Sequence, residues 1–397
     1  MTLTRERLSE VVAKDAAIRR VQRLQPAGGA GDKVFPPTYL GEGPNAPPRH
    51  VFETRRINGQ DVRCVLLDSV QSQANRLEEA LRDAMREGRL RLPHLVVDFS
   101  GKRAEVHHQE YDLSDIGQIT VLDAPHRIFD AIIRDSEYNS TQFPSSEVGK
   151  RLQTAKPQNA LAVFEVSPTA LLFGVWNSHG EGGGLGAKFA RCLVSEIVGV
   201  NAAEGWRTSS RLDPLGIRAG IRVQGGPLDW EVAQDNARRP SRPSGIGHSN
   251  IAPEVTKGGV TVDYALHTAV ISCAGLRRLR FPGTSDENAG RTVLAALGLT
   301  ALTLQDEAGY ALRSRCNLVC DGRAPFEVVR SDGTTESFDM SAQEALSVFQ
   351  EAVDKAREAG FPWNEEPIRL TPQKKLVELV AISRAKGLAG ELETEEQ

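Results

Sequence analysis

The sequence is poor in cysteine and in aromatic residues. Only five of its 397 residues are cysteines, and Phe, Trp and Tyr together make up 6%. The cysteines are odd in number and stand mostly within apolar runs, which is typical of free core thiols in a reducing compartment and argues against a disulfide framework. Cys316 and Cys320 are spaced CxxxC, but no second pair completes a zinc site, so no metal is expected.

Long apolar runs are also missing. No window approaches the roughly 20 consecutive apolar residues of a membrane-spanning helix. The residues from Met1 to Arg7 carry charges with no apolar segment behind them, unlike a standard secretion signal. We therefore expect a cytoplasmic protein without a membrane contact. At roughly 100 to 200 residues per domain, the length allows two or three domains, or one domain enlarged by insertions.

The common signatures of catalysis are absent as well. There is no HExxH, no GxSxG and no nucleophilic-cysteine motif. The adjacent His107 and His108 would point to opposite faces of a strand, and the other histidines with Asp98 or Asp123 show no metal-binding or acid–base spacing. We expect no catalytic residue, no metal and no cofactor.

The glycine-rich loop Gly180–Gly186 is the most prominent motif. It is not a Walker loop, because Lys188 is followed by Phe189 where that motif needs Ser or Thr. Gly182, Gly184 and Ala187 fit GxGxxA, yet no βαβ unit surrounds them. Two interpretations stay open: a loop that contacts nucleic-acid phosphate together with Lys188 and Arg191 on a following helix, or a structural turn.

Charge is distributed unevenly. The net charge is -4, but residues 331–397 hold 14 acidic and 7 basic residues, which leaves +3 on residues 1–330. Arginine outnumbers lysine by 37 to 11, and its planar guanidinium binds phosphate and stacks on bases. A GC-rich genome would give the same arginine bias, so composition permits a nucleic-acid partner without proving one.

Apolar periodicity predicts an α+β fold, because strands and helices do not alternate regularly. Helices are predicted over residues 4–24, 69–81, 126–134, 187–197, 265–280, 291–306, 342–359 and 372–386. Strands are predicted over residues 62–67, 95–99, 160–166, 170–176, 217–224, 260–264, 314–320 and 325–330. The predicted units are an N-terminal helix with a Gly/Pro-rich arm (1–50), a core (51–330) and an acidic helical segment (331–397).

Basic residues gather in several places that suit a binding surface. Arg127 and Arg134 are seven apart on one predicted helix side, and Arg207 and Arg211 flank hydroxyl residues that suit phosphate oxygens. The run Arg277–Arg280 equally fits a solvated helix end. Three aromatic residues lie near these basic residues in the sequence. They are either platforms on which nucleobases stack or, by default, core residues: Trp176, Phe189 and Trp206.

Several separated segments together resemble the large RAMP-superfamily backbone subunit, of the Cas-seven class, of type I-G (formerly I-U) CRISPR effector complexes. The resemblance spans residues 62–318. The segments that carry it are Val65–Arg76, Ala124–Ala131, Val175–Gly180, Lys188–Arg191 and Pro243–Ile251.

This resemblance implies a modified ferredoxin-like, RRM-like core with large insertions and, beyond it, a helical C-terminal extension. It implies a non-catalytic subunit that polymerises along CRISPR RNA, holds the RNA backbone and leaves bases free to pair with target DNA, next to other effector subunits. A hairpin "thumb" is expected from residues 104–121 or 225–259. The implied RNA contacts are His126, Arg127, Asn177, His179, Lys188, Arg191, Arg211, His248 and Asn250.

Two features bear on the alternatives. Related RAMP subunits cut RNA with a loop aspartate, so a metal-dependent endoribonuclease using Asp68 or Asp98 is the second hypothesis, followed by a nucleotide-using enzyme built on the glycine loop. The aromatic sheet motif of free-standing RNA-recognition domains is absent, which favours contacts to the RNA backbone over base stacking on the sheet.

Overall fold

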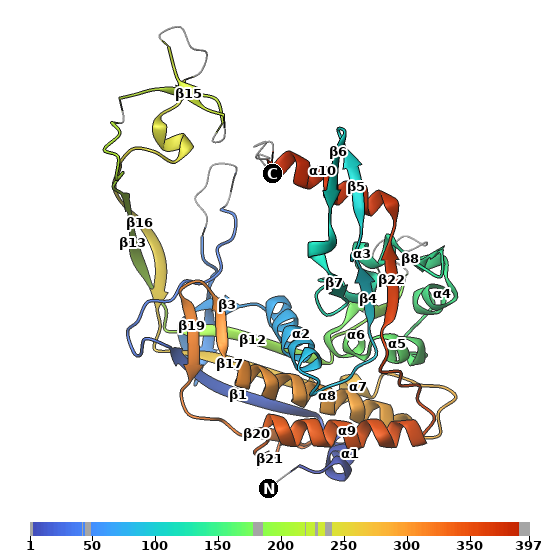
Figure 1. Ribbon diagram of the computed structural model, residues 1–397. Coiled ribbons are helices and arrows are strands. Elements are labelled where there is room, and N and C mark those ends of the chain that lie inside the picture. Colours follow the sequence, from blue (N-terminus) through green and yellow to red (C-terminus); the bar gives the residue numbers. More distant parts are fainter. Residues whose placement is uncertain are drawn as a thin grey trace.

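The computed structural model of the chain describes residues 3–41, 43, 49–177, 186–218, 220–226, 229–234 and 240–388. Helices and strands are mixed without regular alternation around a curled, antiparallel central sheet (Figure 1). The α+β class predicted from the sequence is thus confirmed, together with a helical C-terminal extension.

The central sheet has the strand order β18-β19-β1-β17-β12-β3-β2, with β20 and β21 attached beside β1. Side chains alternate across β17, which places Ala265, His267, Ala269 and Ile271 on the buried side. The strands are β1 (Ala17–Pro26), β2 (Phe52–Ile57), β3 (Gln60–Asp68), β12 (Leu193–Val200), β17 (Tyr264–Ser272), β18 (Tyr310–Arg313), β19 (Cys316–Cys320), β20 (Phe326–Val329) and β21 (Thr335–Phe338).

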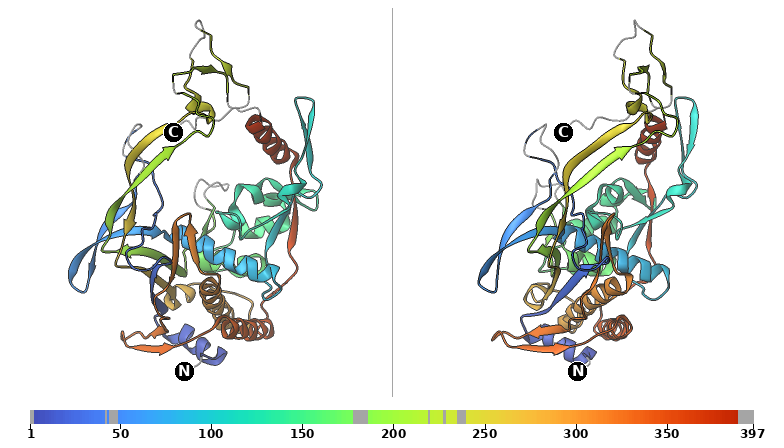
Figure 2. Two further views of the ribbon diagram at one scale, coloured as in Figure 1. Left: turned by 60° about the vertical axis from the view of Figure 1, so that its left-hand side comes forward. Right: turned by 90° about the vertical axis from the view of Figure 1, so that its left-hand side faces the viewer.

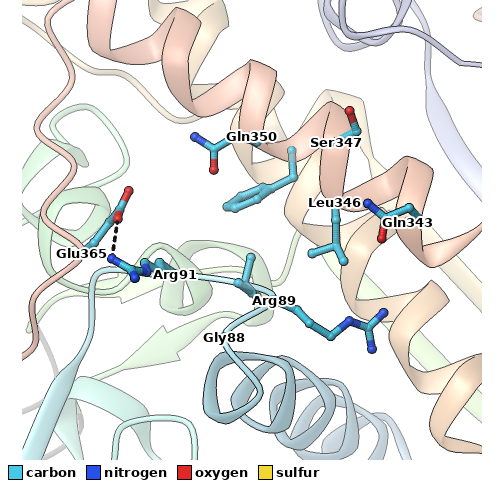
Figure 3. Close-up of a pocket in the computed structure, with 10 residues that line it drawn as sticks. Gly88, Arg89, Arg91, Gln343, Leu346, Ser347, Gln350 and Glu365 are labelled. Carbon is cyan, nitrogen blue, oxygen red and sulfur yellow. Dashed lines mark ion pairs between the residues drawn. The ribbon is translucent and has the colours of Figure 1, made fainter.

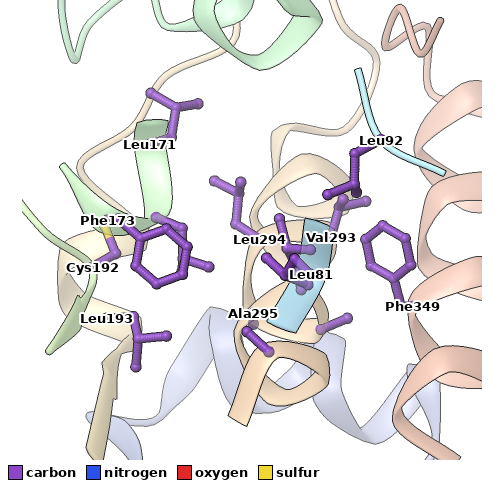
Figure 4. Packing of buried hydrophobic residues seen from close by; sticks show 14 of the residues in the cluster. Leu81, Leu92, Leu171, Phe173, Cys192, Leu193, Val293, Leu294, Ala295 and Phe349 are labelled. Atoms are coloured by element: carbon purple, nitrogen blue, oxygen red, sulfur yellow. The ribbon is translucent and has the colours of Figure 1, made fainter. Parts of the chain in front are cut away.

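Helices pack against the buried side of this sheet and form the main core with it. They are α1 (Arg5–Lys14), α2 (Val70–Arg86), α8 (Glu287–Ala308) and α9 (Ala342–Glu358). Figure 4 shows Leu81 of α2, Leu294 of α8 and Phe349 of α9 meeting in this core. Ser69 caps α2 by accepting the Ser72 amide, and Ser341 with Glu344 forms a capping box on α9, so both helices begin where their sequences predict.

Several predicted elements are wrong because apolar runs were assigned the wrong period. The predicted helix 4–24 is α1 followed by β1, and the predicted helices 187–197 and 265–280 are mainly strands β11 (Lys188–Phe189), β12 and β17, the last followed by the short α7 (Cys273–Leu276). The predicted strands 160–166 and 170–176 are α5 (Leu161–Val166), α6 (Pro168–Phe173) and β10 (Val175–Trp176). Every residue of α6 is buried, so its sequence shows no amphipathic period.

A second, five-stranded sheet with the order β7-β4-β22-β8-β9 stands beside the main body. Its strands are β4 (Leu95–Asp98), β7 (Gln118–Thr120), β8 (Ser136–Tyr138), β9 (Thr141–Gln142) and β22 (Ile368–Pro372). The hairpin of β5 (Arg103–Val106) and β6 (Gln109–Asp112) projects from it next to α10 (Lys374–Leu388), where Arg384 pairs with Asp115 at 2.7 Å. The first thumb candidate, residues 104–121, contains most of this hairpin and continues through β7.

A long two-stranded ribbon continues directly from two neighbouring strands of the central sheet. β13 (Ala203–Arg211) follows β12, β16 (Ile251–Thr261) precedes β17, and the two pair with each other. The outer end holds β14 (Val223–Gln224), β15 (Glu231–Val232) and the 3₁₀ helix η4 (Pro243–Ile246). This ribbon contains the second thumb candidate, residues 225–259, and it projects from the same side of the body as the β5–β6 hairpin (Figures 1 and 2).

A buried polar network crosses the core side of the sheet. The Ser195 Oγ lies 2.7 Å from the His267 Nε2, the His267 Nδ1 lies 3.2 Å from the Tyr310 hydroxyl, and this hydroxyl donates to Asp306 at 2.6 Å. Asp306 in turn pairs with the buried Arg20. Although Ser, His and Asp follow one another here, Ser195 and His267 are 2% and 1% exposed, so the network is part of the core.

We expect the network to make folding sensitive to mild acid. Burial, together with the charge of Arg20, lowers the pKa of His267 from 6.5 to about 3, whereas Asp306 acts in the opposite direction. The unfolded chain therefore binds a proton at His267 that the folded chain does not, and stability falls as the pH drops below 6.5. In urea titrations the loss from this group is about 1.4 kcal/mol between pH 7.5 and pH 5.5. The variant His267→Gln should lack this part of the pH dependence of the free energy of unfolding. The same pH dependence in both proteins would contradict the assignment to His267.

Candidate nucleic-acid interface

Five of the residues expected to contact RNA come together beside the central sheet. The 3₁₀ helix η2 (Arg127–Phe129) lies next to β10, and β10 pairs with β11 so that Trp176 stands opposite Lys188. The structure thus joins two sequence segments that are about 50 residues apart. The five residues are His126, Arg127, Asn177, Lys188 and Arg191.

Arg127 has a different role from the one predicted. It is 4% exposed, and its Nε and Nη2 donate to the two carboxylate oxygens of Glu78 at 2.7 Å each. Its Nη1 donates to the carbonyl of Gly174 at 3.1 Å, which ties η2 to the start of β10. Burial raises the pKa of Glu78 to about 7, although the facing Arg127 acts against this shift. Arg127 therefore supports the site from inside, and its predicted contact with RNA phosphate is corrected.

The exposed part of the cluster is a tryptophan beside a lysine. Trp176 is 50% exposed, and the Lys188 Nζ lies 5.1 Å from the centroid of its ring. Arg191 donates from Nε to the carbonyl of Phe173 at 2.9 Å and keeps part of its side chain accessible. We call Trp176, Lys188, Arg191, His126 and Asn177 the Trp–Lys surface. An aromatic face beside a cation suits single-stranded nucleic acid, because a base stacks on the ring and a phosphate pairs with the cation.

Gly174 allows this surface to form. Its φ is +79°, and a Cβ added there would lie 2.9 Å from the Arg191 backbone nitrogen. Only glycine accepts both the left-handed conformation and the close approach. Gly174 therefore lets the chain turn from α6 into β10 directly against Arg191.

The remaining described site residues lie on the outer part of the ribbon. Arg211 ends β13, and the Asn250 Oδ1 accepts the amide of Asp213 at 2.6 Å. The His248 ring packs edge-on against Trp230, with centroids 5.8 Å apart. The structure thus separates Arg211, His248 and Asn250 from the Trp–Lys surface and places them on the projecting ribbon (Figure 2).

The segment that comes after the glycine loop is a strand, whereas the sequence predicts a helix there. Lys188 stands on β11 and Arg191 precedes β12. The helix N-terminus that would bind a phosphate is therefore not formed at these residues, and the contact rests on the side chains alone. His179 and residues 180–185 lie outside the described residues.

Two of the three tryptophan and phenylalanine residues singled out in the sequence are exposed, although core packing is their default. Phe189 is 3% exposed and belongs to the core, but Trp176 and also Trp206, at 59%, are exposed. Across the ribbon Trp206 pairs with Lys257, and the ribbon and its tip carry further exposed apolar side chains: Leu212, Leu215, Ile221, Trp230, Val232, Ile251 and Val255. The available signal was that Trp206 stands alone among polar residues, with no apolar periodicity around it.

The aspartates considered for RNA cutting are held in structural contacts. Asp68 is fully buried and pairs with Arg76 at 2.9 Å and Arg313 at 3.0 Å, while Gln73 donates to it at 2.7 Å. The Asp98 Oδ1 accepts the Ser100 amide, and its Oδ2 accepts Gln118. In the described parts of the chain, no group of three or more His, Cys, Asp or Glu side chains is arranged to hold a metal ion.

The cysteine thiols are mostly interior. Cys64, Cys192, Cys273 and Cys316 are buried, whereas Cys320 is exposed. Burial raises the pKa of Cys192 to about 12 and that of Cys273 to about 11, so these thiols stay protonated near neutral pH. The prediction of core thiols is confirmed for the four buried residues and wrong for Cys320.

Comparison with known families agrees with the resemblance at a coarser level. Residues 18–204, from β1 to the first residues of the ribbon, match the family model "CRISPR-associated protein GSU0053". This match, over slightly less than half of the chain, supports a subunit of a CRISPR system. No curated protein matches the sequence. None of the helices among the described residues has the length and apolar character needed to cross a membrane.

Proposed function

We propose that the chain is a non-catalytic backbone subunit of a type I CRISPR effector complex, of the Cas-seven class and subtype I-G. In this role several copies assemble along one CRISPR RNA, hold its backbone and leave bases free to pair with target DNA, while other effector subunits cap the assembly. The family match supports the CRISPR system, and the resemblance described above supports the subunit type.

The observation that carries the proposal is the Trp–Lys surface. Its exposed Trp176 and Lys188 stand on the paired strands β10 and β11. The buried ion pair of Arg127 with Glu78 holds this pair of strands in place, because Arg127 also donates to the carbonyl of Gly174. A surface that contacts phosphates through cations and bases through one ring binds RNA with little sequence preference. Such binding is what a subunit needs when it must accept any guide sequence.

Particle mass with and without RNA tests the function. The full chain is expressed with and without a CRISPR RNA, its mass is measured by light scattering, and bound RNA is released and sized. We expect an oligomer that ribonuclease treatment dissociates and that contains intact RNA of defined length. A particle free of nucleic acid, whose mass ignores added RNA, would refute the proposal.

Lys188→Ala should weaken binding to all single-stranded RNA sequences by a similar factor. The ammonium neutralises a phosphate, so the dependence of log Kd on log salt concentration should fall by about 0.7, the value for one contact on a single strand. The matched control is Lys355→Ala on α9, whose ammonium pairs with Glu358 at 2.8 Å on the helical layer. A loss confined to one RNA sequence would contradict a phosphate contact.

A further inference from the structure

The ribbon of β13 and β16 has an irregular base close to the central sheet. The register of the pairing shifts between Glu204 and Trp206. At this shift one residue of β13, Gly205, stands opposite two residues of β16, Gly258 and Gly259. Two residues opposite one form a β-bulge, which bends a strand pair, and glycines weaken a strand because they carry no side chain to pack. We call these three glycines the ribbon base, the point at which the ribbon bends most easily.

A segment of the N-terminal arm crosses the ribbon base. It comprises residues 33–37, which we call the strap. Val34 of the strap pairs with Val260 of β16 through two backbone hydrogen bonds, of 3.0 and 2.8 Å. The strap thus adds a third chain beside the two strands where the ribbon leaves the body.

Lys33 of the strap contacts both strands of the ribbon. Its Nζ donates to the carbonyl of Trp206 on β13 at 2.6 Å. Its carbon chain lies where the glycines leave room: a Cβ added to Gly205 would lie 2.9 Å from the Lys33 Cε, and a Cβ added to Gly259 would lie 2.7 Å from the Lys33 Cδ. A side chain at either glycine would therefore displace Lys33. One lysine side chain thus fills the ribbon base and joins its two strands.

The strap is also tied to the main body. The Phe35 amide donates to the carbonyl of Arg315 at 3.0 Å, and the Arg315 guanidinium lies 4.2 Å from the centroid of the Phe35 ring. Arg315 stands between β18 and β19 of the central sheet. Val34 is 2% exposed and belongs to the same core cluster as Leu318 of β19. The strap therefore connects the ribbon base to the central sheet through contacts on both of its sides.

A small rotation at the ribbon base has a large effect at the outer end of the ribbon. Arg211 comes six residues after Gly205, which is roughly 20 Å along a strand. A rotation of about 10° at the base would move Arg211 by roughly 3.5 Å, which is enough to break a hydrogen bond. The place of the outer ribbon residues relative to the Trp–Lys surface therefore depends on what fixes the base.

We propose that the strap holds the ribbon at one angle to the body, and that Lys33 is the positioning residue through which it does so. The contacts of Lys33 with both strands resist bending at the glycines, and the contacts of Phe35 with Arg315 pass this restraint to the central sheet. Without Lys33 the ribbon rotates about its base while its two strands stay paired. The strap acts in the free chain, so its role stands or falls separately from RNA binding.

Distances between two spin labels, measured by double electron–electron resonance on the full chain without RNA, test the strap. One label is attached to the ribbon at Ser210→Cys and the other to the body at Glu79→Cys, both at exposed positions. Cys320 is replaced by serine throughout, because it is the exposed one of the five cysteines. A control pair joins Glu79→Cys to Ser347→Cys, so both labels are on the body. Ser347 is exposed and lines a pocket of about 670 Å³ between the end of α2 and α9, which leaves room for the label (Figure 3).

We expect a narrow distribution of ribbon-to-body distances when Lys33 is present. In Lys33→Ala the distribution should broaden by roughly 3 Å, the displacement that a rotation of about 10° gives at Ser210. Lys33→Met keeps the carbon chain over the glycines but loses the hydrogen bond to the Trp206 carbonyl, so its distribution should broaden less.

The matched control is Lys257→Ala, which removes a lysine that also lies near the ribbon base but whose side chain is 66% exposed. This variant should leave the ribbon-to-body distribution unchanged, and the control pair on the body should be unchanged in every variant. A distribution in Lys33→Ala as narrow as with Lys33 present would overturn the proposal, and so would equal broadening in Lys257→Ala. If Lys33→Ala does not fold, the width measured for Lys33→Met decides in the same way.

Discussion

Replacing Glu78 by alanine is expected to lower the free energy of unfolding by about 3–5 kcal/mol, the cost of leaving one partner of a buried ion pair alone. Arg127 would keep its charge in the core and lose both carboxylate contacts. Because Arg127 also holds the Gly174 carbonyl, the Trp–Lys surface should loosen with it, and RNA affinity should fall even though Glu78 is 1% exposed.

Urea unfolding at pH 8, above the raised pKa of Glu78, measures this effect. The matched control is Glu79→Ala, the neighbouring and exposed glutamate on the same helix, which should change stability by no more than about 0.5 kcal/mol. The double variant Glu78→Leu with Arg127→Met removes both charges and should recover much of the loss. Equal stabilities of Glu78→Ala and Glu79→Ala would contradict the structural role of the pair.

Trp176→Ala is expected to reduce the affinity for single-stranded RNA by about 1–3 kcal/mol, the contribution of one base stacked on an aromatic ring. The ring is half exposed, so the variant should fold like the unmodified chain, which circular dichroism checks. Trp176→Phe should retain most of the affinity, because a smaller ring still offers a face.

The salt dependence separates Trp176 from its neighbour Lys188. Removing the ring should leave the slope of log Kd against log salt unchanged, whereas removing the ammonium should lower it. An unchanged affinity of Trp176→Ala would remove the ring from the interface. A changed slope would mean that Trp176 acts only by positioning the cation above it.

Sequence alone predicted the elements whose apolar pattern is clear. The predictions for the strand β3, the capped helix α2 and the amphipathic helix α9 are correct. Each contains a group of buried apolar residues, and both helices begin at a serine N-cap. The sequence prediction gives the wrong type for α6, whose residues are all buried, and for β17, whose residues alternate between buried and half-buried. It predicts a strand at α6 and a helix at β17. Their period is hidden by tertiary contacts that no local pattern records.

The candidate site shows the same limit. The resemblance selected segments that do meet in space, because His126, Asn177, Lys188 and Arg191 lie around one short ladder. It also selected Arg127, whose burial depends on Glu78, 49 residues away in the chain. Whether a cation faces outward or inward is decided by the fold, and the exposure of Trp176 follows from the same arrangement.

Because the ribbon continues strands of the central sheet, its length can change independently of the rest of the fold. β13 and β16 continue β12 and β17 after two residues on each strand (201–202 and 262–263), and the pairing keeps the same register across this break, so the ribbon grows or shrinks by inserting or deleting residues in both strands at once. Steps of two residues per strand keep every side chain on its face, whereas steps of one exchange the faces carrying Trp206 and Arg207. The reach of the ribbon can therefore change in increments of roughly 7 Å while the helical core stays untouched.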